Sequence, residues 1–236
     1  MCNLINLWII KGQFLGSKNK LKRFIENESF KNLLQPSREE IISGDFNLRA
    51  DYRLFFKNEN PLVLELGCGK GEYSIGLAKL NQNNNYIGID IKGARIWRGA
   101  KTAVEEKIQN VLFIRTQVEL LDLIFNKNEI DQIWLTFPDP QIKFKRRKHR
   151  LTNFDFIQKY KKILSKNGTI HLKTDSEFLH GYTLGILESM GINPCFSEHN
   201  IYKNNNAPKE VLDLKTHYEK TFLKKEKNIS YLKFKL

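Results

Sequence analysis

Short, almost wholly apolar runs recur along the chain from residue 61 onward, and stretches with helical spacing separate them. The runs cover residues 61–66, 86–91, 111–115, 132–137 and 169–174. The stretches between and after them cover residues 72–80, 93–107, 118–125, 153–164 and 176–190. Strands without polar alternation are typical of a parallel sheet that is covered on both faces. The pattern therefore predicts repeated βαβ units, an α/β protein with a mostly parallel sheet.

The two ends of the chain depart from this rhythm. Residues 216–225 and 229–236 flank a short polar turn, so we expect an antiparallel hairpin at one edge of the sheet. Residues 16–60 contain a helix-capping box at 37–40 and otherwise predict a basic arm with a lead-in helix. Residues 1–15 match no structural pattern. We expect a disordered extension there, ahead of a single domain at 61–236.

Composition limits the class of protein. Of the 236 residues, 41% are apolar, which suffices for a core and excludes a disordered chain. No run approaches the roughly 18 apolar residues of a membrane helix, and residues 4–10 lack the flanks of a signal peptide. Cys2, Cys68 and Cys195 are too widely spaced for a disulfide framework or a zinc site. We therefore expect a cytoplasmic protein with no metal.

The net charge of +13 is concentrated in two segments. Residues 141–150 contribute +6 and residues 215–236 contribute +5. Clustered cations favour a polyanionic partner, because each contact with a phosphate releases bound counterions. A solvated face is the alternative for a lone basic run. The first run directly follows a strand and the acidic residue Asp139, and this placement favours a nucleic acid.

A glycine-rich loop follows the first strand. Gly67, Gly69 and Gly71 come directly after Glu65, and Asp90 ends the second strand. The G-x-G-x-G spacing differs from dinucleotide and phosphate-loop patterns, so it disfavours a pyrophosphate ligand. The glycines let the backbone approach a ligand closely, and a carboxylate at a strand end can accept both hydroxyls of a ribose. Acidic surroundings suit a cationic ligand, so we expect S-adenosylmethionine, with a plain tight turn as the alternative.

A second group of chemically suggestive residues follows the fourth strand. Asp139 lies between Pro138 and Pro140, which restrict the backbone on both sides of it. In an open parallel sheet, ligands bind beyond the carboxyl ends of the strands where the strand order reverses. We therefore expect Asp139 to face the same site as the glycine loop. Asp175, after the fifth strand, is either part of this site or the cap of the next helix.

Together these motifs resemble those of the bacterial tRNA (guanine-46-N7-)-methyltransferases. The resemblance covers roughly residues 16–236, and its most specific parts are the Pro-Asp-Pro turn with its basic run and the element at 216–219. It implies a Rossmann-like class I methyltransferase with a mostly parallel seven-stranded sheet, helices on both faces and a C-terminal antiparallel hairpin. It also implies transfer of a methyl group from S-adenosyl-L-methionine to N7 of guanine 46 in the variable loop of tRNA.

The resemblance further implies roles for single residues. Those expected to contact the methyl donor or line its pocket are Glu65, Gly67, Gly69, Gly71, Asp90, Thr116 and Asp139. Those expected to contact the substrate base are Lys143, Asp175, Thr216, His217, Tyr218 and Glu219. Those expected to touch tRNA are Lys145, Arg146, Arg147, Lys148, His149 and Arg150.

The chain departs from the pattern of that family at two places. Gln141 stands where most relatives carry an aromatic residue, typically Trp, and this puts one packing or stacking contact in doubt. Residues 115–117 read Arg-Thr-Gln where the family usually shows Asp or Asn. A hydrogen bond to the adenine edge must then come from Thr116, Gln117 or the backbone.

The chemistry of guanine N7 defines what such a protein must do. N7 carries a free lone pair in the neutral base, so its methylation removes no proton, and the protein has to position base and donor for in-line displacement. Asp139 is the candidate catalytic residue. It would either stabilise the positive charge that develops on the purine or grip the N–H donors of the guanine Watson–Crick edge. We favour the grip, because adenine offers no N1–H.

Three other interpretations stay open on the sequence alone. They are a class I methyltransferase for another RNA base, a nicotinamide-dependent oxidoreductase on a Rossmann sheet, and an RNA-binding protein without catalysis. The glycine spacing argues against the oxidoreductase. The intact Glu65, Asp90 and Asp139 argue against a protein that has lost its site. Both a monomer and a homodimer fit the sequence.

Overall fold

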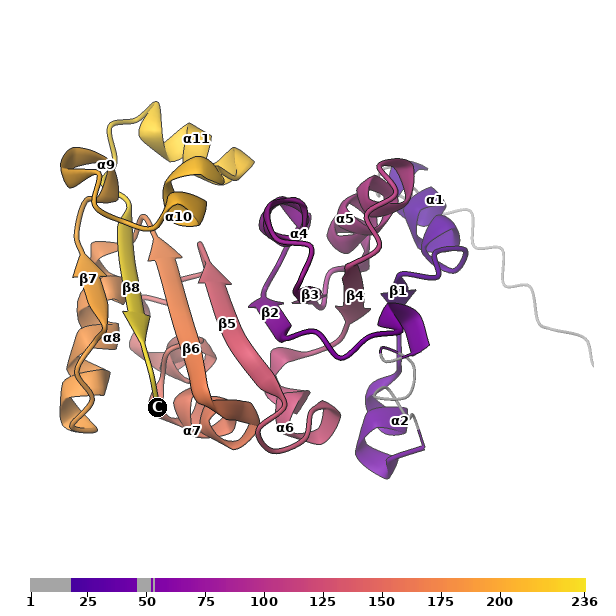
Figure 1. Ribbon diagram of the computed structural model, residues 1–236, viewed down its shortest axis with the longest axis horizontal. Coiled ribbons are helices and arrows are strands. Elements are labelled where there is room, and N and C mark those ends of the chain that lie inside the picture. The colour runs from indigo at the N-terminus through magenta and orange to yellow at the C-terminus, as the bar shows by residue number, and fades with distance from the viewer. Residues whose placement is uncertain (1–17, 46–51, 53) are drawn as a thin grey trace, which may run out of the picture.

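One eight-stranded sheet runs through the part of the chain that the computed structural model describes, residues 18–45, 52 and 54–236 (Figure 1). The expected extension at 1–15 lies outside these residues. The strand order is β1-β4-β3-β2-β5-β6-β8-β7. The strands are β1 (Leu33–Leu34), β2 (Leu62–Leu66), β3 (Asn85–Asp90), β4 (Val111–Arg115), β5 (Ile130–Thr136), β6 (Leu164–Thr174), β7 (Phe196–Glu198) and β8 (Ser230–Phe234).

The predicted βαβ rhythm is confirmed. The five apolar runs form β2 to β6, which pair in parallel. The sheet has eight strands where seven were expected, and it includes a two-residue strand, β1, from the N-terminal arm, which pairs in parallel with β4. So short a strand leaves no periodic signal in the sequence.

Helices cover both faces of the sheet. Alternation along β2 shows the division, because Leu62, Leu64 and Leu66 enter one apolar cluster while Val63 enters the other. The first cluster includes residues of α2, α6, α7 and α8, and the second includes residues of α4, α5, α9 and α10. These helices are α2 (Arg38–Ser43), α4 (Glu72–Leu80), α5 (Gly93–Glu105), α6 (Leu121–Ile124), α7 (Phe154–Ile163), α8 (Glu177–Ser189), α9 (Ile201–Asn204) and α10 (Lys209–Asp213).

The remaining helical segments lie before, within and after this series. They are α1 (Lys18–Asn27), the 3₁₀ helices η1 (Val118–Leu120) and η2 (Phe144–His149), and α11 (His217–Leu223). Within the described residues, no helix is long and apolar enough to cross a membrane.

The C-terminal edge of the sheet is antiparallel, as expected, but its elements differ from the prediction. β8 pairs antiparallel with β6 on one side and with β7 on the other. The first arm of the expected hairpin, residues 216–225, instead contains the helix α11. Thr216 caps this helix by accepting a hydrogen bond from the backbone N–H of Glu219 at 3.2 Å. Such a cap stabilises the first turn of a helix, which explains why the segment is not a strand.

The strand order reverses between β2 and β5. β2 pairs with β3 on one side and with β5 on the other, and all three run in the same direction. The glycine loop after β2 and the Pro-Asp-Pro turn after β5 therefore meet at the carboxyl edge of the sheet. Figure 1 shows α4, α5, α10 and α11 at this same edge, where the arrowheads of β5 and β6 lie.

Candidate active site

The glycine loop takes a backbone path that requires its glycines. Gly67, Gly69 and Gly71 all have positive φ values, of +75°, +57° and +69°. A Cβ on Gly71 would lie 2.5 Å from the Phe113 ring, whereas a Cβ on Gly69 would meet nothing within 4 Å. The loop thus packs tightly against the core at Gly71 and leaves open space at Gly69.

Asp90 holds the loop from the neighbouring strand. Its carboxylate accepts hydrogen bonds from the backbone N–H of Gly69 at 2.9 Å and of Lys92 at 2.7 Å. The end of β3 and the turn of the glycine loop are therefore fixed to each other. This places a carboxylate beside the open part of the loop.

Glu65 is buried on the face of β2 that packs against α4. Its carboxylate accepts hydrogen bonds from the Ser74 backbone N–H at 2.8 Å and from the Ser74 and Thr136 hydroxyls. Burial raises the pKa of the Glu65 carboxyl to about 7, although these hydrogen bonds oppose the rise. The cause of the raised pKa is the cost of burying the charged form, which makes the carboxyl easier to protonate than an exposed glutamate.

A cavity opens at the carboxyl edge between the glycine loop, α4 and the start of α11. Six of the residues expected at the site line it, namely Glu65, Gly67, Gly69, Thr216, His217 and Tyr218, whereas Gly71, Asp90, Thr116 and Asp139 do not. Residues that sequence reasoning missed also line it, namely Cys68, Lys70, Glu72, Tyr73, Arg95, Thr136 and Phe137. Thr136 could have been found from its place at a strand end. Arg95 carried no signal, because only the fold brings α5 to this cavity.

The start of α11 forms one wall of the cavity. The backbone N–H of His217 donates to the Glu72 carboxylate at 2.6 Å, which joins α11 to the helix after the glycine loop. Tyr218 is about half exposed, at 49%, and stacks on Phe222 with ring centroids 6.5 Å apart. Phe222 in turn contacts the ring of Phe137. An aromatic surface therefore borders the cavity where α11 begins.

Glu219 lies behind this wall and does not face the cavity. It is fully buried and pairs with Lys173 on β6, with 2.7 Å between the Lys173 Nζ and the Glu219 Oε1. The Tyr202 hydroxyl donates to the same carboxylate at 2.6 Å. Burial lowers the pKa of Lys173, and the Glu219 carboxylate opposes that shift. The expectation that Glu219 contacts the substrate is therefore corrected. Glu219 is buried and anchors α11 to the sheet.

Asp139 is exposed in the turn after β5. Its carboxylate accepts a hydrogen bond from the backbone N–H of Gln141 at 2.9 Å. Phe137 and Gln141, on either side of the Pro-Asp-Pro turn, both have positive φ, of +48° and +47°. Such values are uncommon outside glycine and mark a strained, defined turn. Asp139 lies two residues beyond Phe137, which lines the cavity.

Arg150 turns inward, away from solvent. Its guanidinium donates to the carbonyl oxygens of residues 140–142 at 3.1–3.3 Å and lies over the rings of Phe178 and Tyr182. It is 6% exposed. The expected contact of Arg150 with tRNA is corrected accordingly, because its donors already hold the turn. The other five expected tRNA contacts, Lys145, Arg146, Arg147, Lys148 and His149, lie exposed on η2.

The two remaining substrate candidates lie at the rim. Lys143 is exposed and precedes η2 as its N-cap. Asp175 pairs with Lys227, with 2.9 Å between the Lys227 Nζ and the Asp175 Oδ2. The alternative that Asp175 caps the next helix is wrong, because Ser176 caps α8.

Thr116 lies in a neighbouring hollow at the ends of β3 and β4. This hollow is also lined by Ile91, Arg115 and Gln117 and by the start of α2. Ile91 is 53% exposed there. Asp90 lines neither space, but it accepts a hydrogen bond from Gly69 of the cavity wall and is followed directly by Ile91 of this hollow.

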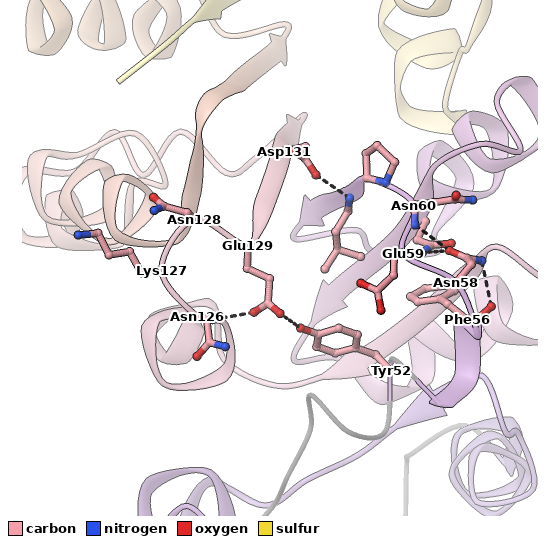
Figure 2. Close-up of a pocket in the computed structure, with 13 residues that line it drawn as sticks. Tyr52, Phe56, Asn58, Glu59, Asn60, Asn126, Lys127, Asn128, Glu129 and Asp131 are labelled. Atoms are coloured by element: carbon pink, nitrogen blue, oxygen red, sulfur yellow. Dashed lines mark hydrogen bonds between the residues drawn. The ribbon is translucent and has the colours of Figure 1, made fainter.

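Figure 2 shows a different pocket, at the amino edge of the sheet. Asp131 of β5 accepts a hydrogen bond from the Leu62 backbone N–H at 2.9 Å, and Glu129 accepts one from the Tyr52 hydroxyl. Asn58 and Asn85 bond to each other at 2.7 Å. This pocket lies at the strand starts, away from the glycine loop, and its polar groups hold loops together.

Cys68 lines the cavity but is not a reactive thiol. The Cys68 thiol is buried, and burial raises its pKa, so it stays protonated and unreactive. Among the described residues, no group of three His, Cys, Asp or Glu side chains is placed to hold a metal.

Comparison with known proteins identifies the family. A family model described as "Putative methyltransferase" matches residues 59–232. The tRNA (guanine-N(7)-)-methyltransferase of Christiangramia forsetii is 58% identical over 223 residues, which cover 94% of this chain and all of that protein. The chain belongs to the tRNA (guanine-N(7)-)-methyltransferase family. The family members of Porphyromonas gingivalis, at 46% identity over 81% of this chain and 78% of theirs, and of Bacteroides fragilis, at 40% over 93% and 86%, agree with this.

Solved structures support the same fold. The 16S rRNA methyltransferase KamB superposes with a TM-score of 0.60 at 12% identity, covering 78% of this chain and 92% of that one. An antibiotic-related methyltransferase superposes with a TM-score of 0.58 at 18% identity, covering 79% and 92%. The Rossmann-like class I methyltransferase fold is confirmed.

Membership of the tRNA (guanine-N(7)-)-methyltransferase family makes the chain an enzyme with S-adenosylmethionine as its methyl donor. The oxidoreductase and the non-catalytic RNA-binding protein are therefore both wrong. The residues present fit such a donor. A Cβ on Gly69 would project into open space, so the loop backbone is accessible to a ligand there, and the cavity wall carries the carboxylates of Glu65 and Glu72 together with the cations of Lys70 and Arg95, which suits a donor with groups of both charges.

Proposed function

We propose that this chain methylates N7 of guanine 46 in the variable loop of tRNA. The observation that carries the proposal is a donor cavity with carboxylates on its wall, bounded by α11, beside a turn that bears Asp139 and a run of exposed cations. Such an arrangement joins a cation-binding cavity to a phosphate-binding rim. The 58% identity to a tRNA (guanine-N(7)-)-methyltransferase supports the reaction type.

The donor side of the site is assigned to the glycine loop and its partners. S-adenosylmethionine supplies the methyl group when it is bound. In this proposal Asp90 accepts hydrogen bonds from ribose hydroxyls, and Gly67 and Gly69 allow the backbone to lie against the ligand. Glu65 offers a carboxylate for a cationic group. Thr116 and Gln117, in the adjoining hollow, are the candidates for the adenine edge.

The base side is assigned to the Pro-Asp-Pro turn and the start of α11. Asp139, fixed by the turn, grips the N–H donors of the guanine Watson–Crick edge, which leaves N7 free to accept the methyl group. Thr216, His217 and Tyr218 bound the base, while Lys143 and Asp175 lie at the rim. No residue has to take up a proton, because N7 is unprotonated in the neutral base. The protein therefore acts by positioning.

The role of Asp139 has its own test. Asp139→Asn keeps the size of the side chain and removes the charge. We expect single-turnover methyl transfer to slow by about 10- to 1000-fold, with S-adenosylmethionine affinity unchanged by calorimetry. A variant that loses donor affinity but transfers the methyl group at the normal rate would assign Asp139 to donor binding alone.

The function is tested by incubating bulk tRNA with labelled S-adenosylmethionine, followed by nucleoside analysis. We expect label in 7-methylguanosine, and transcripts with guanine 46 replaced by adenine should take up none. Another labelled nucleoside in place of 7-methylguanosine would contradict the base assignment. Label that persists in the adenine-46 transcript would contradict the position.

A further inference from the structure

An aromatic ring stands out among the cations of the basic run. Phe144, the first residue of η2, is 75% exposed. Burying a Phe side chain is favourable in water, so a ring this bare gains from any apolar or aromatic partner that covers it. The proposed function gives this ring no role.

The geometry of η2 places a cation over one face of the Phe144 ring. Residues three apart eclipse each other in a 3₁₀ helix, so Arg147 lies directly over Phe144. The Arg147 guanidinium carbon is 4.1 Å from the ring centroid. The cation covers part of the ring, and at 75% exposure the rest is open to solvent. A flat ligand could therefore stack on the open part, with the cation on the other side.

The charges around the ring select the kind of ligand. Lys143, Lys145, Arg146 and Lys148 are all exposed. Within the described part of the chain, none of these four lies within ion-pair distance of a carboxylate. An exposed ring next to these cations combines two features that proteins use to bind single-stranded nucleic acid, positive charge for the backbone and an aromatic face for stacking.

The segment is also held in place. Asn153 donates through its Nδ2 to the carbonyl oxygen of Lys148 at 2.9 Å, and the backbone N–H of Arg146 donates to the carbonyl oxygen of Lys143 at 2.9 Å. The inward guanidinium of Arg150 holds residues 140–142 just before the ring. The ring is thus presented by a preformed turn, which lowers the entropic cost of binding.

We propose that Phe144 is a stacking platform for an unpaired base of the tRNA strand that carries the target guanine. The inference rests on the proposed function and adds a second base contact to it. Phe144 is five residues from Asp139, so the two lie at most about 18 Å apart. That distance is spanned by a few nucleotides of an extended strand, so the stacked base is a near neighbour of the methylated one.

The test separates stacking from charge. For Phe144→Ala we expect the Kd for tRNA to rise about 5- to 100-fold, the range for loss of one base–aromatic stack. The slope of log K against log salt should stay unchanged, because no cation is lost. Phe144→Trp should bind like the wild type and show fluorescence quenching on tRNA binding beyond that of the wild-type tryptophans.

Ile142→Ala is the matched control, because Ile142 is 67% exposed in the same segment but has no ring. It should bind tRNA normally. Wild-type affinity in Phe144→Ala, an equal loss in Ile142→Ala, or full rescue by Phe144→Leu would overturn the stacking role. If wild-type protein forms no 7-methylguanosine, the proposed function fails instead, whereas normal 7-methylguanosine formation with an unaffected Phe144→Ala contradicts only the platform.

Discussion

Glu65 is a buried carboxylate that connects three elements of the site. It links β2 to α4 through Ser74 and to the end of β5 through Thr136. Burial raises its pKa to about 7, so the ligand-free protein holds a proton on it in part of the population. A cation in the cavity favours the ionised form. Binding of a cationic donor is therefore linked to release of this proton.

The affinity for S-adenosylmethionine should accordingly depend on pH. Below about pH 7 the donor has to displace a proton from Glu65, so we expect affinity to rise as the pH increases toward 7 and to level off above it. Calorimetry in two buffers of different ionisation enthalpy measures the released proton directly. Glu65→Gln should bind more weakly and without this pH dependence. A flat wild-type profile would show that Glu65 is not the linked group.

The buried pair of Lys173 and Glu219 makes a different kind of prediction. Glu219→Gln leaves the Lys173 ammonium uncompensated in the core, and we expect the free energy of unfolding to fall by about 3–5 kcal/mol. The double variant Lys173→Met with Glu219→Leu should recover much of that loss, since no charge stays buried. Chemical denaturation measures both. The coupling between Lys173 and Glu219 would be contradicted if the double variant lost as much free energy of unfolding as the two single variants together.

Some site residues could be read from the sequence and others could not, and the difference is physical. The positions of Glu65, Gly67 and Gly69 on the cavity wall could be predicted because they follow from a loop between a strand and a helix, which is local. Glu219 and Arg150 were misjudged, because their partners are set by the fold. Lys173 lies 46 positions before Glu219, and nothing local distinguishes Arg150 from the exposed cations before it.

At the scale of elements, the glycine loop and α11 were predicted with unequal success. The loop follows from glycine spacing after a strand. The segment at 216–225 was expected as a strand because it and residues 229–236 flank a short polar turn, yet Tyr218 and Phe222 are spaced as on one face of a helix. The antiparallel partner of β8 at the edge of the sheet is instead the three-residue β7, which is too short to have a readable pattern.

The glycine loop itself offers a paired test of fold against function. In Gly71→Ala the new Cβ meets the buried Phe113 ring at 2.5 Å at a positive φ, and we expect a loss of about 2 kcal/mol or more in the free energy of unfolding. In Gly69→Ala the Cβ meets no protein atom, so stability should fall by only about 1 kcal/mol.

Donor binding should show the opposite ranking to stability. Gly69→Ala places its Cβ in the space assigned to the ligand, so its S-adenosylmethionine affinity should fall at least tenfold. Gly71 does not line the cavity, so the folded fraction of Gly71→Ala should keep most of its affinity. Thermal unfolding and calorimetry on the same samples measure both. Normal S-adenosylmethionine affinity in Gly69→Ala would show that the glycine loop is not part of the donor site.

At the scale of the whole molecule, the surplus charge and the sheet topology agree. The carboxyl edge of the parallel strands carries the carboxylates of the cavity and, beside them, the cations of η2. The net charge alone indicated only that the partner is a polyanion. The order of the strands, with β2 next to β5, is what brings the donor cavity and the basic run to one edge.

Replacing Lys145, Arg146, Arg147 and Lys148 together by Ala tests this arrangement. We expect weaker tRNA binding and a shallower dependence of log K on log salt, by up to about 3 in slope. Donor affinity should be unchanged. Alanine at Lys127 and Lys166, exposed at the opposite edge of the sheet, is the control for non-specific charge loss. A slope as steep as that of the wild type would exclude phosphate contacts by this run.

The anchor behind α11 also constrains how this chain can diverge. The side chains of Lys173 and Glu219 are both buried away from water, and each is the other's counter-charge. A change at one position leaves a lone charge in the core until the other changes too. Across descendants of this sequence the two positions should therefore be kept or replaced as a pair, although 46 residues and most of the C-terminal third of the chain separate them.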